Sequence, residues 1–152
     1  MANSTAAAIA YPKTLFPDYE CYLSPGTVVN DAPTSRLCGG VSLLVHKRLN
    51  YMFERIWVEF DHIIVMRVAN ELLGTAKPVF LIAVYLPPTG SVYYDDTDIV
   101  NKVSILEQCM LDIVEQFPDA LFLIIFAQTE RNQCAKLAKF ANFLYLGFFL
   151  QA

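Results

Sequence analysis

Two apolar segments on either side of one long helical stretch constrain the fold of this 152-residue chain most strongly. Residues 78–86 (PVFLIAVYL) and 120–126 (ALFLIIF) are apolar without alternation. Strands with this pattern are covered on both faces, so we expect both to lie inside a layered fold. The prolines at 87–88 must end the first strand, because proline cannot donate to the hydrogen-bond ladder of a sheet.

The segment between these strands, residues 95–117, has the period of an amphipathic helix. Its apolar residues recur at steps of three and four: Ile99, Val103, Leu106, Met110, Ile113 and Phe117. Carboxylates at its start, Asp95, Asp96 and Asp98, suit free N–H groups and the helix dipole, and Pro118 ends it. Strand, long helix and strand form a crossover unit, which predicts two parallel neighbouring strands.

The rest of the chain predicts more strands within a single domain of mixed α+β type. Residues 55–60 (RIWVEF) alternate apolar and polar side chains, which is typical of a half-buried strand. Gly74 breaks a turn over 70–77, and residues 1–18 are expected to form a loose N-terminal arm. The further strands are predicted at 19–23, 41–47 and 63–68.

Composition excludes several classes of protein. Hydrophobic residues make up 55% of the chain and charged residues 17%, which excludes intrinsic disorder. The net charge is -4, and Lys47-Arg48 is the only adjacent basic pair, so bulk charge does not favour nucleic-acid binding. The longest apolar run near the C-terminus, 140–150, is too short for a membrane span and is expected to be buried.

The cysteines and the N-terminus indicate an intracellular protein, cytoplasmic or nuclear rather than secreted. Residues 1–10 lack the basic start and long apolar core of a signal peptide. No cysteine belongs to a C-x-x-C motif or has zinc-finger spacing to histidine, so we expect reduced thiols and no zinc. The four cysteines are Cys21, Cys38, Cys109 and Cys134.

Few residues have an obvious chemical role. The only histidines, His46 and His62, stand beside apolar strands and are expected to be strand-end residues with local partners. The acids at 95–98 could hold a hard cation, but helix capping alone explains them. Glu54 and Glu71 are interpreted as solvated side chains, and no phosphate-binding loop, nucleophile elbow or metalloprotease motif is present.

A family resemblance extends this interpretation. Four segments in order, 37–45 (LCGGVSLLV), 80–88 (FLIAVYLPP), 106–108 (LEQ) and 121–125 (LFLII), resemble the endonuclease/exonuclease/phosphatase superfamily, which has a deoxyribonuclease I-like fold. The closest kind is the endonuclease domain of LINE-type retrotransposons. The resemblance implies an incomplete four-layer α/β-sandwich, truncated at both ends, with a partial domain over 19–125 and a divergent apolar tail over 126–152.

The same resemblance implies a site and shows what it lacks. The family cleaves phosphate esters with Mg²⁺ or Mn²⁺ and acts on DNA in its endonuclease members. It uses a Glu, a Tyr in a Y-x-P motif, an Asp and Asn in G-D-F-N, and a late Asp-His pair. Tyr85 matches the motif Tyr, whereas residues 126–129 (FAQT) stand in place of G-D-F-N. We therefore expect an inactive domain with a vestigial Tyr85 and no metal cofactor.

Two alternatives remain open at this point. An active magnesium-dependent nuclease or phosphatase could use substitute ligands, namely Asp95, Asp96 or Glu130. A non-enzymatic interaction module could use the apolar tail instead. Leu137, Phe140, Leu144 and Phe148 share a helical face, which predicts a helix over 135–150. Because the second sheet of the family would be incomplete, we also expect uncovered apolar surface and self-association.

Overall fold

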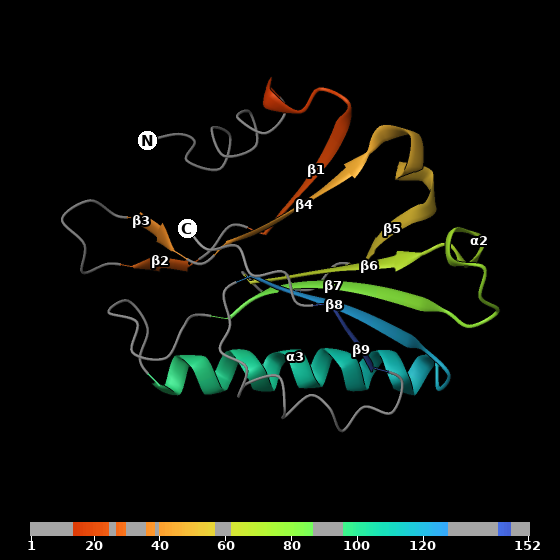
Figure 1. The fold of residues 1–152 in the computed structure, drawn as a ribbon. Coiled ribbons are helices and arrows are strands. Elements are labelled where there is room, and N and C mark those ends of the chain that lie inside the picture. The colour runs from red at the N-terminus through yellow and green to blue at the C-terminus, as the bar shows by residue number, and fades with distance from the viewer. Residues whose placement is uncertain are drawn as a thin grey trace.

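The computed structural model describes residues 14–24, 27–29, 36–38, 40–56, 62–86, 96–127 and 143–146. This part of the chain forms three sheets, one long helix and two short helices (Figure 1). The elements are β1 (Tyr19–Ser24), β2 (Thr27–Val29), β3 (Arg36–Cys38), β4 (Val41–His46), the 3-10 helix η1 (Lys47–Met52), β5 (Phe53–Ile56), β6 (Ile63–Val68), α2 (Asn70–Leu73), β7 (Val79–Tyr85), α3 (Asp96–Gln116), β8 (Leu121–Ala127) and β9 (Phe143–Leu146).

The largest sheet has the order β5-β6-β7-β8-β9. Its first three strands are antiparallel neighbours, and β7, β8 and β9 run parallel to one another. The chain leaves β7, passes through α3 and returns as β8 beside β7. The predicted crossover unit is therefore confirmed, with two apolar strands near the middle of the sheet as expected.

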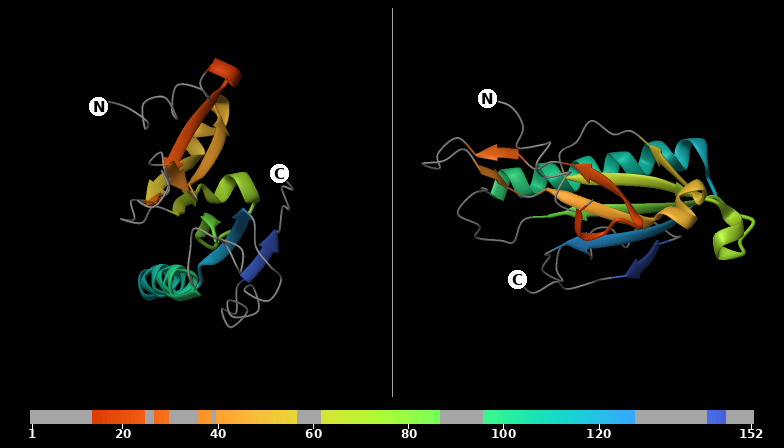
Figure 2. Two further views of the ribbon diagram at one scale, coloured as in Figure 1. Left: turned by 90° about the vertical axis from the view of Figure 1, so that its left-hand side faces the viewer. Right: turned by 90° about the horizontal axis from the view of Figure 1, so that it is seen from above.

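The helix α3 packs on one face of this sheet and forms the first core (Figure 2). Alternate side chains of β8, namely Phe122, Ile124 and Phe126, point into this core and are almost fully buried. From the helix, Leu106 and Met110 are fully buried against them. The predicted apolar face of the helix is thus the face that packs on the sheet.

A second, smaller core lies on the opposite face of the sheet, under the two-stranded β1–β4 sheet. Val41 of β4 packs there with Ile64 and Met66 of β6 and Ala83 of β7. The described residues thus form three layers: α3, the five-stranded sheet and the β1–β4 sheet (Figure 1). This arrangement confirms the α+β class and the strands predicted near β1, β4, β6, β7 and β8.

Several segments differ from the sequence prediction. The turn predicted over 70–77 contains the helical turn α2, which ends where Gly74 adopts a left-handed φ of 61°. The strand predicted at 55–60 begins earlier, at Phe53, and residues 57–61 lie outside the described part. Of the expected loose arm, Asp18 is tied to the start of η1, because the Lys47 N–H donates to the Asp18 carbonyl at 2.8 Å.

The predicted C-terminal helix is wrong at Phe143–Leu146, which form strand β9. These residues pair in parallel with β8, from Phe122↔Phe143 to Ile125↔Leu146. Pairing occupies the backbone groups along the outer side of β8, and aromatic residues suit strands, so tertiary pairing overrides the weak helical pattern. The rest of 135–150 lies outside the described residues.

Candidate functional site

Tyr85, the candidate residue that the resemblance indicated, ends strand β7. Its backbone N–H donates to the His62 carbonyl at 2.9 Å, and on the other side its register partner is Ala127 of β8. The carboxyl ends of neighbouring parallel strands lie at the same end of the sheet, which is where open α/β sheets commonly bind ligands. The fold therefore brings Tyr85 beside Ala127, the residue at which the resemblance would imply the G-D-F-N aspartate.

The Tyr85 ring belongs to the second core rather than to an open cleft. It is half-buried and packs with the residues between the β1–β4 sheet and the large sheet. Tyr22 and Leu43 contact the same core from the β1–β4 side. Packing thus accounts for an aromatic residue at this strand end without a catalytic role.

His62 lies in the same row across the sheet and is 3% exposed. Its ring Nε2 is 3.4 Å from the backbone carbonyl of Lys102 in α3, and because a carbonyl only accepts, Nε2 carries the proton. Burial, with a smaller contribution from the Lys102 charge, lowers the pKa of His62 from 6.5 to about 4. The ring is therefore neutral near pH 7, and it links the end of the sheet beside Tyr85 to helix α3.

The local-partner prediction holds for His46 and is wrong for His62. His46 Nδ1 accepts from the Arg48 N–H at 3.2 Å and so caps η1. Its ring also meets Tyr19 edge-on, with 5.1 Å between ring centroids. The partner of His62, by contrast, is forty residues away, since only the packing of α3 on the sheet brings Lys102 to it.

The proposed substitute ligands do not assemble in the described part of the structure. Asp95 and Glu130 lie outside the described residues, and only the backbone of Asp96 is described, as the first residue of α3. Among the residues that the structure describes, no three His, Cys, Asp or Glu side chains lie close enough together to hold a metal ion.

The two described thiols, Cys21 and Cys109, are both reduced. Cys21 is a reduced, half-buried thiol, and Cys109 is reduced and buried in the first core. Burial, followed by the nearby Asp112 carboxylate, raises the pKa of Cys109 to about 11. A thiol with that pKa is protonated near pH 7 and a poor nucleophile. The other two cysteine side chains, Cys38 and Cys134, lie outside the described side chains.

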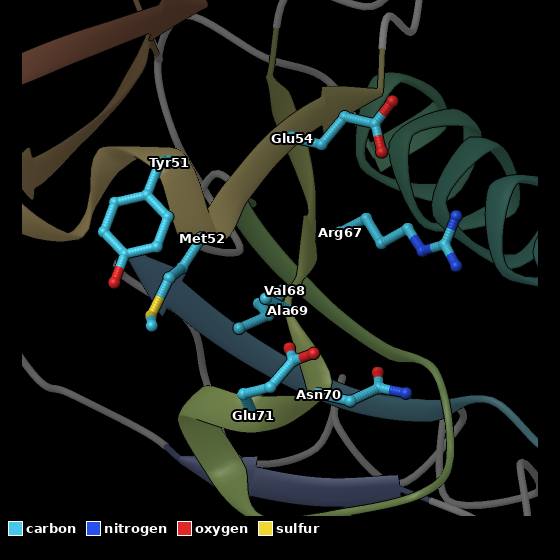
Figure 3. A pocket seen from close by; sticks show the side chains of 8 residues that line it. All are labelled: Tyr51, Met52, Glu54, Arg67, Val68, Ala69, Asn70 and Glu71. Atoms are coloured by element: carbon cyan, nitrogen blue, oxygen red, sulfur yellow. The ribbon is translucent and has the colours of Figure 1, made fainter.

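A hollow of about 310 Å³ lies at the other end of the sheet, where β5, β6 and α2 meet (Figure 3). In Figure 3 the side chains of Glu54, Arg67 and Asn70 extend side by side without their polar ends meeting, and the Arg67 guanidinium lies 5.1 Å from the centre of the Phe117 ring. The hollow therefore gathers no converging set of groups. Its lining consists of Tyr51, Met52, Glu54, Arg67, Val68, Ala69, Asn70 and Glu71.

The sequence patterns indicated only some of the residues that line this hollow. Glu54 and Glu71 are exposed, as their interpretation as solvated residues predicted. Arg67 is a lining residue that the motifs do not indicate, although a single charge within the apolar strand IIVMRV is a signal that its side chain leaves the core. Its guanidinium lies over the ring of Phe117, the residue that follows α3.

Comparison of the chain with protein-family models, curated proteins and solved structures finds no match. The resemblance described above therefore stands on the quoted segments and on Tyr85. Within the described part of the chain, no helix has the length and apolar character needed to cross a membrane.

Proposed function

We propose that this chain is a catalytically inactive relative of the metal-dependent phosphodiesterases, of the LINE-type retrotransposon endonuclease kind. Two features of the fold support this proposal. A two-stranded sheet faces the five-stranded sheet, and a long helix covers the outside of the larger one. The proposal includes a four-layer α/β-sandwich as the parent arrangement.

The observation that carries the proposal is the pairing of Tyr85 with Ala127. If the resemblance holds, this pairing puts the motif tyrosine and the position of the family aspartate at neighbouring strand ends, as a shared site would require. Alanine offers no oxygen to a hard cation, and Mg²⁺ sites of phosphate-transfer enzymes depend on carboxylates. Without a bound metal, the negative charge that develops on the phosphate has no strong stabiliser.

The positions of the histidines also support an inactive protein. A general base must reach the attacking water and have a pKa near the working pH. His62 lies near the strand ends, but its ring is buried and donates its Nε2 proton to a backbone carbonyl. No histidine follows position 62 in the sequence. The late His of the family therefore has no counterpart here.

The proposal is tested by incubating the purified chain with supercoiled DNA and Mg²⁺ or Mn²⁺. We expect no nicking above a blank without protein, and no binding of either metal by calorimetry. The matched control is Tyr85→Phe, which keeps the ring in the second core and removes only the hydroxyl. Metal-dependent nicking that Tyr85→Phe abolishes would show an active nuclease and overturn the proposal.

A gain-of-function variant tests the same idea from the other side. Placing Asp at Ala127 and Asn at Thr129 rebuilds two motif residues, yet we expect no measurable turnover. The missing Glu and late His act in the same constellation, and residues that act as a unit do not contribute additively. Turnover by this double variant would mean that the other ligands are already present.

A further inference from the structure

Exposed apolar side chains gather at one end of the β1–β4 sheet. Two segments form this end, residues 14–19, which lead into β1, and residues 47–51 of η1, and we name them together the end patch. Tyr51 is 79% exposed and Leu15 is 53% exposed. Exposed apolar surface rimmed by polar residues is typical of an interaction site. Of the nine large apolar side chains that are exposed in the described part of the chain, five belong to the end patch: Leu15, Phe16, Tyr19, Leu49 and Tyr51.

Hydrogen bonds between described residues hold the two segments of the end patch side by side. The Lys47 N–H at the start of η1 donates to the Asp18 carbonyl at 2.8 Å. Further along η1, Asn50 Oδ1 accepts from the hydroxyl of Tyr22 in β1 at 2.6 Å. Figure 1 shows both segments at the top of the molecule and α3 at the bottom. The end patch is therefore one surface, on the side of the described fold that lies away from α3.

The end patch is locally basic although the whole chain is acidic. It contains Lys47 and Arg48, the only adjacent basic pair in the sequence, against a single acid, Asp18. All three residues are exposed. The net charge of the whole chain is -4. At physiological ionic strength, charges more than about 8 Å away are largely screened, so a surface in contact with the end patch meets its local positive charge.

We propose that the end patch binds the surface of an anionic lipid bilayer. Its apolar side chains enter the interfacial layer, and Lys47 and Arg48 meet the anionic headgroups. Tyrosine rings favour the membrane–water interface, and basic side chains near a bilayer are attracted by anionic lipids. Two basic side chains supply only a small attraction, so binding is weak and depends on the anionic lipid.

The composition of the end patch favours lipid over a nucleic acid. Proteins that bind single strands stack bases on aromatic rings, and leucine side chains do not take part in such stacking. Leu15 and Leu49 supply aliphatic surface, which suits the apolar part of a bilayer interface. The inference goes beyond the proposed function and does not depend on it, because it uses neither Tyr85 nor Ala127.

Lipid binding is tested by flotation of the full chain with vesicles of phosphatidylcholine, with and without about one third of phosphatidylserine. We expect flotation with the vesicles that contain phosphatidylserine, several-fold less with phosphatidylcholine alone, and release at high salt. Arg48→Glu should weaken binding about fivefold or more. Its matched control is Lys77→Glu, an equal charge change at an exposed residue between α2 and β7, which should change binding by less than about twofold.

A second pair of variants tests the apolar contribution. Leu49→Ser should weaken binding about threefold or more, because less apolar surface then leaves water. Leu111→Ser, at an exposed leucine of α3, should leave binding unchanged. Circular dichroism checks that each variant folds. Arg48→Glu should keep the fold, since the bond that His46 Nδ1 accepts comes from the backbone N–H of Arg48.

Each outcome decides the proposal. Weaker binding of Arg48→Glu and Leu49→Ser, with both controls unchanged, supports it. No binding to either kind of vesicle overturns it, as does equal binding to both or an equal loss in all four variants. A dimer in sedimentation velocity that Leu49→Ser dissociates, without any lipid binding, assigns the end patch to a second copy and also overturns it.

Hydrogen exchange of the vesicle-bound chain distinguishes surface binding from insertion of unfolded protein. Slower exchange in η1 with unchanged protection of β7 supports the proposal, because only the end patch then meets the lipid. Loss of protection in β7 overturns it, since β7 belongs to both cores of the folded chain.

Discussion

Acidification should destabilise this protein through His62, a buried titratable group that links the sheet to α3. In the folded state its pKa is about 4, against 6.5 for an unperturbed histidine. The folded protein therefore binds this proton less readily than the unfolded chain does. Stability that is present above pH 6.5 is lost as the pH falls toward 4.

The size of the effect follows from the two pKa values. Between pH 7 and pH 5, protonation of the unfolded chain lowers the free energy of unfolding by about 2 kcal/mol, and by about 3 kcal/mol once the pH is below 4. The window from pH 7 to pH 5 is the useful one, since most carboxylates stay ionised there. The loss is a large part of the stability of a typical domain.

The measurement is urea unfolding at pH 7 and pH 5 for the natural sequence, His62→Gln and His46→Gln. We expect the natural sequence and His46→Gln to lose about 2 kcal/mol between the two pH values, and His62→Gln to lose much less. His46 is the matched control because it is the only other histidine and is less buried. Equal losses in all three proteins, or an NMR titration of His62 with a midpoint near 6.5, would refute the reasoning.

Three further predictions concern stability and reactivity. Ile124→Ala in the first core, at a site with 0% exposure, should cost about 2–5 kcal/mol in urea unfolding, and Ile124→Val only about 1 kcal/mol; equal costs would contradict the packing described. Gly74→Ala should lower the free energy of unfolding by about 1 kcal/mol, and Gly74→Asn by less, because the φ of 61° disfavours alanine more than asparagine. No atom crowds an added Cβ, so the cost comes from the backbone conformation alone. An unchanged stability of Gly74→Ala would contradict a left-handed cap. In native labelling with a thiol reagent, followed by mass spectrometry, Cys109 should react more slowly than Cys21, given its burial and its pKa of about 11; the reverse order would contradict its place in the core.

The sequence predicted the crossover unit because its signals are local. The spacing of Leu106, Met110 and Ile113 defines a helix face, and the unbroken apolar runs at β7 and β8 define covered strands. Both patterns depend on residues close together in the chain. The long-range consequence, a parallel pair, follows because a helical crossover brings the chain back to the starting end of the neighbouring strand. Local patterns also indicated β1 and β4 as strands, but they contain no information on the pairing of one with the other.

The misses have long-range causes. The helical preference of the residues near Leu144 is weaker than the stabilisation that they gain by pairing with β8. The local sequence pattern cannot show that the side of β8 is available for pairing. The contact between His62 and Lys102 also depends on how α3 docks, so the periodicity of either segment could not predict it. Of the candidate site, the sequence indicated Tyr85 through its motif, and only the register of β7 and β8 placed Ala127 beside it.

The two cores differ greatly in size, and this inequality has a dynamic consequence. In the described part of the chain, fifteen buried residues form the core under α3, whereas four form the core under the β1–β4 sheet. Proteins open in cooperative units whose free energies follow their buried contacts. Amides of β1 and β4 should therefore exchange hydrogen when the two-stranded β1–β4 sheet opens locally. Amides of β7 and β8 should exchange only when the whole chain unfolds. The β7–α3–β8 unit, which is contiguous in sequence, is then also the part that can form first as the chain folds.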